Sequence, residues 1–192
     1  MTIAENIARI RANMAAAARE AGRDPKEILL VGASKMNDAA ACREAVAAGI
    51  DALGENRVQE MVQKLEQHAY DGAPLHFIGH LQRNKVKQVV GHVALIQSVG
   101  SLELLDEIEK VAAARGLVQD ILLEVNIGRE AAKSGFAPEK VLPAAEAALE
   151  RTHVRVRGLM TIPPADAQRD ANFRYFQEVQ ALYVDMNQKL FH

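Results

Sequence analysis

The feature that most constrains the fold is the regular alternation of short apolar runs with amphipathic stretches along the chain. Six runs have the length and composition of buried strands. The stretches between them repeat their apolar residues at steps of three and four, which is typical of helices. Strands that alternate with helices predict βα units and a parallel sheet. The expected strands cover residues 28–34, 50–56, 75–79, 93–99, 120–127 and 154–162.

Helix signals support the same alternation. An extra helix is expected before the first strand, because Ile3, Ile7, Ile10 and Met14 follow the helical spacing and Gly22 is a suitable end. Capping residues and a first-turn proline mark several of the other helices: Asn37 or Asp38, Ser101 and Pro138. The helices expected between and after the strands cover residues 38–48, 57–68, 81–90, 101–116, 138–150 and 171–190.

The βα units are short and regular, which predicts a (β/α) barrel of the TIM type. No G-x-G-x-x-G sequence follows the first strand, and this disfavours a dinucleotide-binding fold. A complete barrel of this type has eight strands. The chain supplies about six of the eight, so we expect a single (β/α) barrel domain over residues 1–192 that lacks its C-terminal βα units.

Composition narrows the possible partners. The chain has 192 residues, is 49% hydrophobic, and carries 23 basic against 25 acidic residues, for a formal net charge of -2. This leaves no basic excess to hold a nucleic acid. No apolar run approaches the roughly 20 residues that span a bilayer, and the N-terminus has no continuous apolar signal segment. Since Cys42 is the single cysteine, no internal disulfide can form. A cytoplasmic protein without nucleic-acid or membrane partners is expected.

The candidate functional groups lie at the carboxyl ends of the expected strands, where barrels of this type place their sites. The first strand, "ILLVGASK", ends on Ser34 and Lys35. The second strand ends on Glu55 and Asn56. The third strand ends near His80, with His76 deeper in the strand. The remaining strand ends supply Gln97, Ser98, Asn126, Met160 and Thr161.

Lys35 is the one lysine at a strand tip, and a lysine there is suited to imine chemistry. Burial of an amine disfavours its charged form, and the neutral amine attacks carbonyl groups. The alternative is an exposed lysine that extends into water from the strand end. His76 and His80 do not indicate a metal site, because four residues of extended strand separate two side chains by about 13 Å.

Two neighbouring strands carry charges that alternation places on one face. Val154 and Val156 belong to the apolar face, which leaves Arg155 and Arg157 on the other face, together with Glu124 of the preceding strand. A buried charge without a partner is costly, so we expect Glu124 to pair with these arginines. The alternative is that these are strand ends open to water.

Five motifs in register along the chain resemble one family. They are "VGASK" at 31–35, "GEN" at 54–56 followed by "VQE" at 58–60, "HFIGHLQRNK" at 76–85, "KSGF" at 133–136 and "RGLMTIP" at 157–163. In this order they resemble the pyridoxal phosphate homeostasis proteins, the YggS/PROSC family. The resemblance implies a fold like the barrel domain of alanine racemase. It also implies that Lys35 holds pyridoxal 5'-phosphate (PLP) as a Schiff base and that Asn56, His76 and Met160 contribute to the cofactor site.

One departure from the family concerns the phosphate. Members continue beyond the last helix into strands with Gly-Met-Ser and Arg-Ile-Gly-Thr-like patterns, which resemble phosphate-binding loops. The present sequence ends at "KLFH", before both. We therefore expect that the sequence is a fragment or that a C-terminal part is missing from it, and that a chain ending at His192 binds PLP more weakly than a longer one.

Three functions fit these residues. The first is a carrier and regulator of PLP, acting as a monomer on PLP and on PLP-dependent apoenzymes. The second is a PLP-dependent enzyme such as an amino-acid racemase, which needs a second base, usually a tyrosine. The three tyrosines, Tyr70, Tyr175 and Tyr183, lie in expected helices or at their ends. The third is a cofactor-free aldolase, for which Glu55 is the one candidate acid/base beside Lys35.

Overall fold

The structure is a computed structural model that describes residues 1–165 and 168–190. Six strands follow one another in the sheet in chain order, and the strand pairs β1–β2, β4–β5 and β5–β6 are parallel. This confirms the α/β class and the six strands expected from the alternation. Two compact units make up the chain, Met1–His76 and Phe77–His192.

The first unit alternates helices and strands after an N-terminal helix. Its elements are α1 (Ile3–Glu20), a 3-10 turn (Pro25–Glu27), β1 (Val31–Ala33), α2 (Ala39–Ala47), β2 (Ala52–Glu55), α3 (Val58–Glu66) and the start of β3 (Leu75–Phe77). A capping box between Thr2 and Glu5 begins α1, and the Asp38 side chain caps α2. The residues at which α1 and α2 begin therefore follow from the local sequence.

The first strand is shorter than the apolar run predicted. Residues 28–30 lie outside β1, because Ile28 closes the preceding 3-10 turn and Leu29 is 64% exposed. The Leu30 N–H donates to the Asp51 carboxylate over 2.6 Å instead of joining a strand ladder. In the pairing of β1 with β2, Ala33 stands opposite Gly54, so the ends of the two strands lie side by side.

The second unit contains the remaining elements. They are a 3-10 turn (Arg83–Lys85), α4 (Val86–Val89), β4 (Leu95–Val99), α5 (Leu102–Arg115), β5 (Gln119–Val125), a 3-10 turn (Pro138–Lys140), α6 (Val141–Leu149), β6 (Val154–Thr161) and α7 (Arg169–Leu190). Residues 81–90, expected as one helix, form only the turn and the short α4. The valines at 86, 89 and 90 are β-branched and favour helix weakly.

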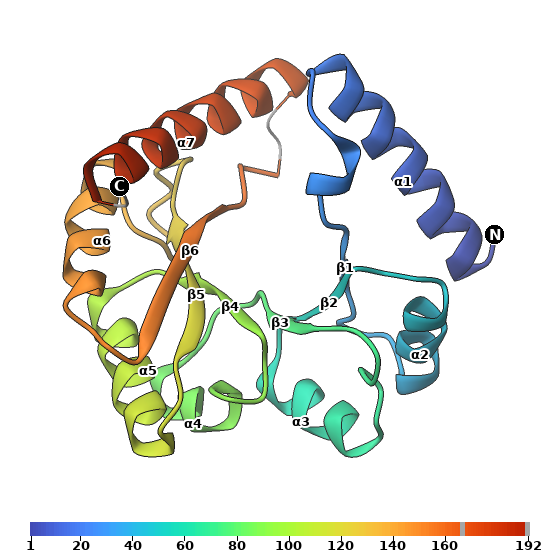
Figure 1. Ribbon diagram of the computed structural model, residues 1–192, viewed down its shortest axis with the longest axis horizontal. Helices are drawn as coiled ribbons and strands as arrows, with labels where there is room; N and C mark the ends of the chain where they lie inside the picture. The colour runs from blue at the N-terminus through green and yellow to red at the C-terminus, as the bar shows by residue number, and fades with distance from the viewer. Residues whose placement is uncertain (166–167, 191–192) are drawn as a thin grey trace. The chain divides into compact units, whose positions relative to one another are not determined.

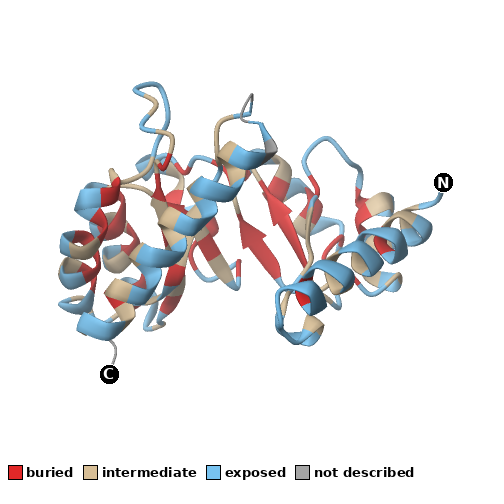
Figure 2. Cartoon of the chain, turned by 90° about the horizontal axis from the view of Figure 1, so that it is seen from above, coloured by how far each residue is buried: buried red, intermediate tan, exposed pale blue. Residues whose placement is uncertain are grey.

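The core of the second unit lies between the sheet and its helices. Residues of β5 alternate between buried and half-buried, and the buried set includes Ile121, Leu123 and Val125. Val125 packs with Ile127 and with Val141 of α6, and Tyr175 of α7 packs against this cluster. In Figure 1, α6 and α7 lie beside β5 and β6, and Figure 2 shows buried strands behind helices whose outer faces are exposed.

A register shift separates the two halves of β6. Ile121 pairs with Val156, but Leu122 pairs with Gly158, so Arg157 is one extra residue in β6. Beyond the shift, Leu159 packs against the helix-side cluster, and Met160 is in register with Glu124. Strict alternation from Val154 and Val156 places Met160 on the helix side. The shift therefore moves Met160 to the opposite face.

The predicted pairing of Glu124 with the arginines is wrong. Arg155 Nε donates to Asp120 Oδ1 over 2.7 Å, and Arg157 Nε lies 3.6 Å from Asp120 Oδ2. Both arginines are exposed at the amino-terminal half of β6, which is the open-to-water alternative. Glu124 lies further along β5 and accepts hydrogen bonds from Ser134. The alternation of side chains predicted which face of the strands carries these charges, but not how far along the strands Glu124 lies from the two arginines.

Among the described residues, no helix has both the length and the apolar character needed to cross a membrane.

Candidate functional site

Lys35 lies in the turn that follows β1, as the sequence predicted. Hydrogen bonds hold the backbone around it: the Ser34 N–H donates to the Gly54 carbonyl over 2.9 Å, and Asn37 Nδ2 donates to the Lys35 carbonyl over 3.2 Å. Met36, the next residue, has a left-handed φ of 62°. The Lys35 side chain is exposed, which agrees with the alternative of a lysine that extends into water and not with that of a buried amine. The amine is thus accessible from solvent on a backbone fixed by several contacts.

Asn56 follows β2, the strand that pairs with β1. Its backbone N–H donates to Glu55 Oε2 over 3.1 Å. Its side-chain oxygen, Oδ1, is buried and has no hydrogen-bond partner in the part of the chain that the structure describes. A buried acceptor without a donor costs about 1–3 kcal/mol, so Asn56 Oδ1 is suited to a donor on a ligand.

His76 is the third site residue of the first unit and lies within β3. Its side chain is buried, and this burial lowers the imidazole pKa below its ordinary value of 6.5. The ring is therefore neutral at neutral pH. The strand β3 follows Pro74, whose carbonyl accepts a hydrogen bond from the Leu53 N–H of β2. Lys35, Asn56 and His76 thus come from three successive strands of one unit.

A buried ion pair lies beneath these residues. Glu55 is 0% exposed and forms an ion pair with Lys64 of α3, whose side chain is 8% exposed. Glu55 Oε1 also accepts from Ser34 Oγ over 2.8 Å and from Tyr70 Oη over 3.4 Å. Sequence reasoning missed Lys64. The available signal was its spacing, because Lys64 follows Val58 and Met61 at steps of three, on the face of α3 that is buried.

These contacts bear on the alternative functions. The Glu55 carboxylate is enclosed by its partners, so it is not available to exchange protons with a substrate at Lys35, as an aldolase requires. Burial, followed by the nearby Glu55 charge, raises the pKa of the Tyr70 phenol. Tyr70 is therefore protonated and engaged with Glu55, which does not suit a second catalytic base.

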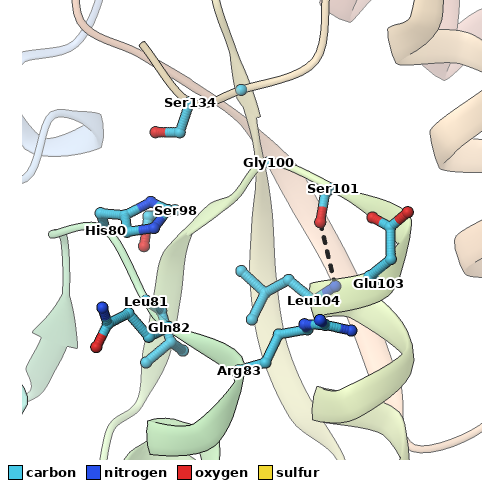
Figure 3. Close-up of a pocket in the computed structure, with 11 residues that line it drawn as sticks. His80, Leu81, Gln82, Arg83, Ser98, Gly100, Ser101, Glu103, Leu104 and Ser134 are labelled. Carbon is cyan, nitrogen blue, oxygen red and sulfur yellow. Dashed lines mark hydrogen bonds between the residues drawn. The ribbon is translucent and has the colours of Figure 1, made fainter. Parts of the chain in front are cut away.

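The second unit holds a cavity of about 690 Å³ at the ends of its strands (Figure 3). Its lining includes His80 and Ser98, which the sequence predicts at strand ends. Ser98 Oγ donates a hydrogen bond to the Gly79 carbonyl over 2.5 Å. Ser101 at its wall caps α5 by accepting from the Leu104 N–H over 3.2 Å. The other lining residues are Leu81, Gln82, Arg83, Gly100, Glu103, Leu104, Ser134 and Gly135.

The second unit also contains Met160, a predicted contact of the cofactor, and Glu124, which lies opposite it in the sheet. Met160 is half-buried in β6, in register with Glu124 of β5. Burial raises the pKa of the Glu124 carboxyl above its ordinary value, and the hydrogen bonds from Ser134 oppose this shift. No group of three or more His, Cys, Asp or Glu side chains within residues 1–165 and 168–190 is arranged to hold a metal ion.

Successive parallel βα units with polar groups at the strand ends define an α/β domain of the barrel type. A profile of the family described as alanine racemase, N-terminal domain, matches residues 6–192. The pyridoxal phosphate homeostasis protein of Pseudomonas aeruginosa is 40% identical over 186 residues, which are 97% of this chain and 81% of that protein. The chain therefore belongs to the alanine racemase N-terminal domain family, and within it to the pyridoxal phosphate homeostasis proteins.

Solved structures agree with this assignment. PipY of Synechococcus elongatus, solved with PLP bound, superposes with a TM-score of 0.84 at 28% identity, over 98% of this chain and 83% of that one. An alanine racemase from Clostridium difficile superposes with a TM-score of 0.72 over 84% of this chain and 43% of that one. At 15% identity the racemase shows the fold alone. The fold implied by the five motifs is confirmed.

Proposed function

We propose that this chain binds PLP through Lys35 and acts in PLP homeostasis as a carrier and regulator of the cofactor. The observation that carries the proposal is the pairing of an accessible lysine with a buried, unpartnered acceptor, Asn56 Oδ1, at the ends of two adjacent strands. The relatives named for PLP homeostasis and the PLP-bound PipY structure support it.

The residues present fit this cofactor. When bound, PLP supplies an aldehyde that condenses reversibly with a lysine amine and releases water. Lys35 presents such an amine on a fixed turn. PLP also carries a phenolic hydroxyl and a pyridine nitrogen, and Asn56 Oδ1 is suited to accept a hydrogen bond from either group in its protonated form. His76, neutral through burial, and Met160 complete the proposed set as contacts to the cofactor.

A carrier function fits better than a racemase. Racemisation needs bases on both faces of the substrate, and Lys35 supplies one. The Tyr70 hydroxyl is hydrogen-bonded to Glu55, and the half-buried Tyr175 packs against the core of the second unit. Tyr183 lies in the middle of α7 rather than at a strand end. We propose that the bound PLP passes to PLP-dependent apoenzymes and that the protein acts as a monomer in the cytoplasm.

The test is to locate the attached cofactor. The purified chain is incubated with PLP, reduced with borohydride and digested, and the modified residue is mapped by mass spectrometry. We expect the modification on Lys35, its loss in Lys35→Ala, and its retention in Lys26→Ala, which removes another exposed lysine. A modification that maps to Lys85 or Lys133 in the wild type contradicts the assignment.

Two further measurements test the remaining parts. A holo structure is expected to place Asn56 and Met160 within about 4.5 Å of the cofactor, the distance of ordinary side-chain contact. Asn56→Ala is expected to weaken PLP binding about tenfold, the equivalent of one hydrogen bond of 1.4 kcal/mol. Racemisation of an amino acid by the PLP-loaded protein, measured by chiral chromatography, would replace the carrier function with the enzymatic one.

A further inference from the structure

One helix of the first unit holds the backbone on both sides of Lys35. Lys64 Nζ donates a hydrogen bond of 2.7 Å to the carbonyl of Ser34, the residue before Lys35. Glu60 Oε2 accepts a hydrogen bond of 3.0 Å from the N–H of Met36, the residue after Lys35. Glu60 and Lys64 are one turn apart on α3, and Lys64 Nζ lies 3.6 Å from Glu60 Oε2. The turn that carries Lys35 is therefore fixed by two side chains that are themselves paired.

The same group of contacts reaches Asn56. Glu55 uses Oε1 for Lys64 and Ser34, and it uses Oε2 to accept the Asn56 N–H. A single carboxylate thus connects the end of β1 with the residue after β2. Any movement of Lys64 changes the surroundings of the Lys35 turn and of Asn56 together.

The Lys35 turn needs such support. Met36 has a left-handed φ of 62°, a conformation that residues other than glycine adopt only where the surroundings hold them. The Glu60 pKa is lowered, chiefly by the hydrogen bond from the Met36 N–H and then by the nearby Lys64 and Arg57 charges. Burial acts in the opposite direction but does not outweigh them. Glu60 is therefore ionised at neutral pH, and it holds the strained residue through a charge-assisted hydrogen bond.

Packing alone does not explain a lysine at position 64. The side chain lies on the buried face of α3, together with Val58 and Met61. An apolar residue fills such a face without the cost of taking an ammonium group out of water. What the lysine adds is a donor to the Ser34 carbonyl and a counter-charge for Glu55.

We propose that Glu60 and Lys64 are positioning residues that hold the Lys35 amine and Asn56 in the geometry required for attachment of an aldehyde cofactor. The inference rests on the proposed function, because it assigns to α3 the task of orienting that same site. Neither residue touches the cofactor; each acts through the backbone that flanks Lys35.

The experiment compares two substitutions of Glu60 with a matched control. Glu60→Ala removes the acceptor for the Met36 N–H, Glu60→Gln retains a neutral acceptor, and Glu66→Ala changes an exposed glutamate at the end of the same helix. One readout is the affinity for PLP at Lys35, measured by absorption and by borohydride trapping. The other is hydrogen exchange of the Met36 amide, measured by NMR without PLP.

We expect Glu60→Ala to speed exchange of the Met36 amide and to weaken PLP attachment by about ten- to a hundredfold, the equivalent of one charge-assisted hydrogen bond. Glu60→Gln is expected to recover most of both effects, and Glu66→Ala to match the wild type. The double variant Glu55→Gln, Lys64→Met leaves no unpaired buried charge, and it is expected to weaken attachment about tenfold while circular dichroism shows a folded chain.

The outcomes separate the two proposals. Unchanged Met36 exchange in Glu60→Ala, or full PLP affinity despite faster exchange, overturns the positioning role alone. Full PLP affinity in the double variant overturns the part assigned to Lys64. Absence of PLP from Lys35 in the wild type overturns the proposed function, whatever the amide of Met36 shows.

Discussion

Replacement of Lys64 by methionine is expected to destabilise the protein more than most single substitutions. Glu55 is 0% exposed, and its carboxylate has Lys64 as its ion-pair partner. Lys64→Met preserves the length of the side chain and its packing on α3 but leaves the Glu55 charge buried without a counter-charge. The hydroxyls of Ser34 and Tyr70 remain as hydrogen-bond donors but carry no charge.

The magnitude follows from this geometry. Removal of one member of a buried ion pair costs about 3–5 kcal/mol, whereas replacement of both members by well-packed neutral groups is often close to neutral. Domains of this size have a free energy of unfolding of about 5–15 kcal/mol, so the single substitution removes a large share of it. The double variant Glu55→Gln, Lys64→Met is expected to recover at least half of the loss.

The assay is urea unfolding, followed by far-ultraviolet circular dichroism and by tyrosine fluorescence, since the chain has three tyrosines and no tryptophan. Coincidence of the two transitions is required before a free energy is extracted. A loss below about 1 kcal/mol in Lys64→Met contradicts the reasoning, because that is the value of an exposed pair. Equal losses in the single and the double variant contradict it as well.

Three further predictions concern titration and close packing. Burial lowers the His76 pKa below 6.5, so the imidazole binds a proton more readily in the unfolded chain than in the folded one. The free energy of unfolding is therefore expected to fall as pH drops below 6.5, and an NMR titration of His76 should give a midpoint under that value. Because burial raises the Glu124 pKa above 4.5, its ionised form destabilises the fold as pH rises past 4.5, and Glu124→Gln should unfold at a higher temperature than the wild type at pH 7. A methyl group at Gly100 meets the Gly135 backbone N at 2.7 Å, whereas one at Gly32 comes no closer than 3.4 Å to the side chains of Ile50 and Leu53. Gly100→Ala is therefore expected to lower the melting temperature more than Gly32→Ala.

The parts of the fold that depend on neighbouring residues could be predicted from the sequence. The order of helices and strands, the Ser101 cap of α5 and its end at Gly116 all follow from spacing and capping residues within one element. The same holds for the positions of Lys35 and Asn56 at strand ends, because strand ends follow from where apolar runs stop.

The parts that depend on contacts between elements were not predictable. The Glu55–Lys64 pair exists because α3 packs its buried face against the ends of β1 and β2, and a lysine in a helical pattern carries no sign of its partner. The pairing of Arg155 with Asp120 depends on the register between β5 and β6, which a single strand does not reveal. Exposure of Lys35 likewise depends on what surrounds a turn rather than on the strand that leads to it.

The extra residue in β6 has a consequence for how sequences of this type tolerate length changes. A strand has a period of two, so loss of one residue at position 157 restores an uninterrupted pattern that is easier to form. Without Arg157 the same pairings follow one another directly, because Val156 stays opposite Ile121 and Gly158 stays opposite Leu122. Leu159 therefore remains in the hydrophobic layer, and Met160 remains opposite Glu124. A chain shortened at this position is expected to keep its secondary structure and the proposed Met160 contact. A one-residue gap at position 157 in a sequence alignment is therefore compatible with the same residue standing at the place of Met160.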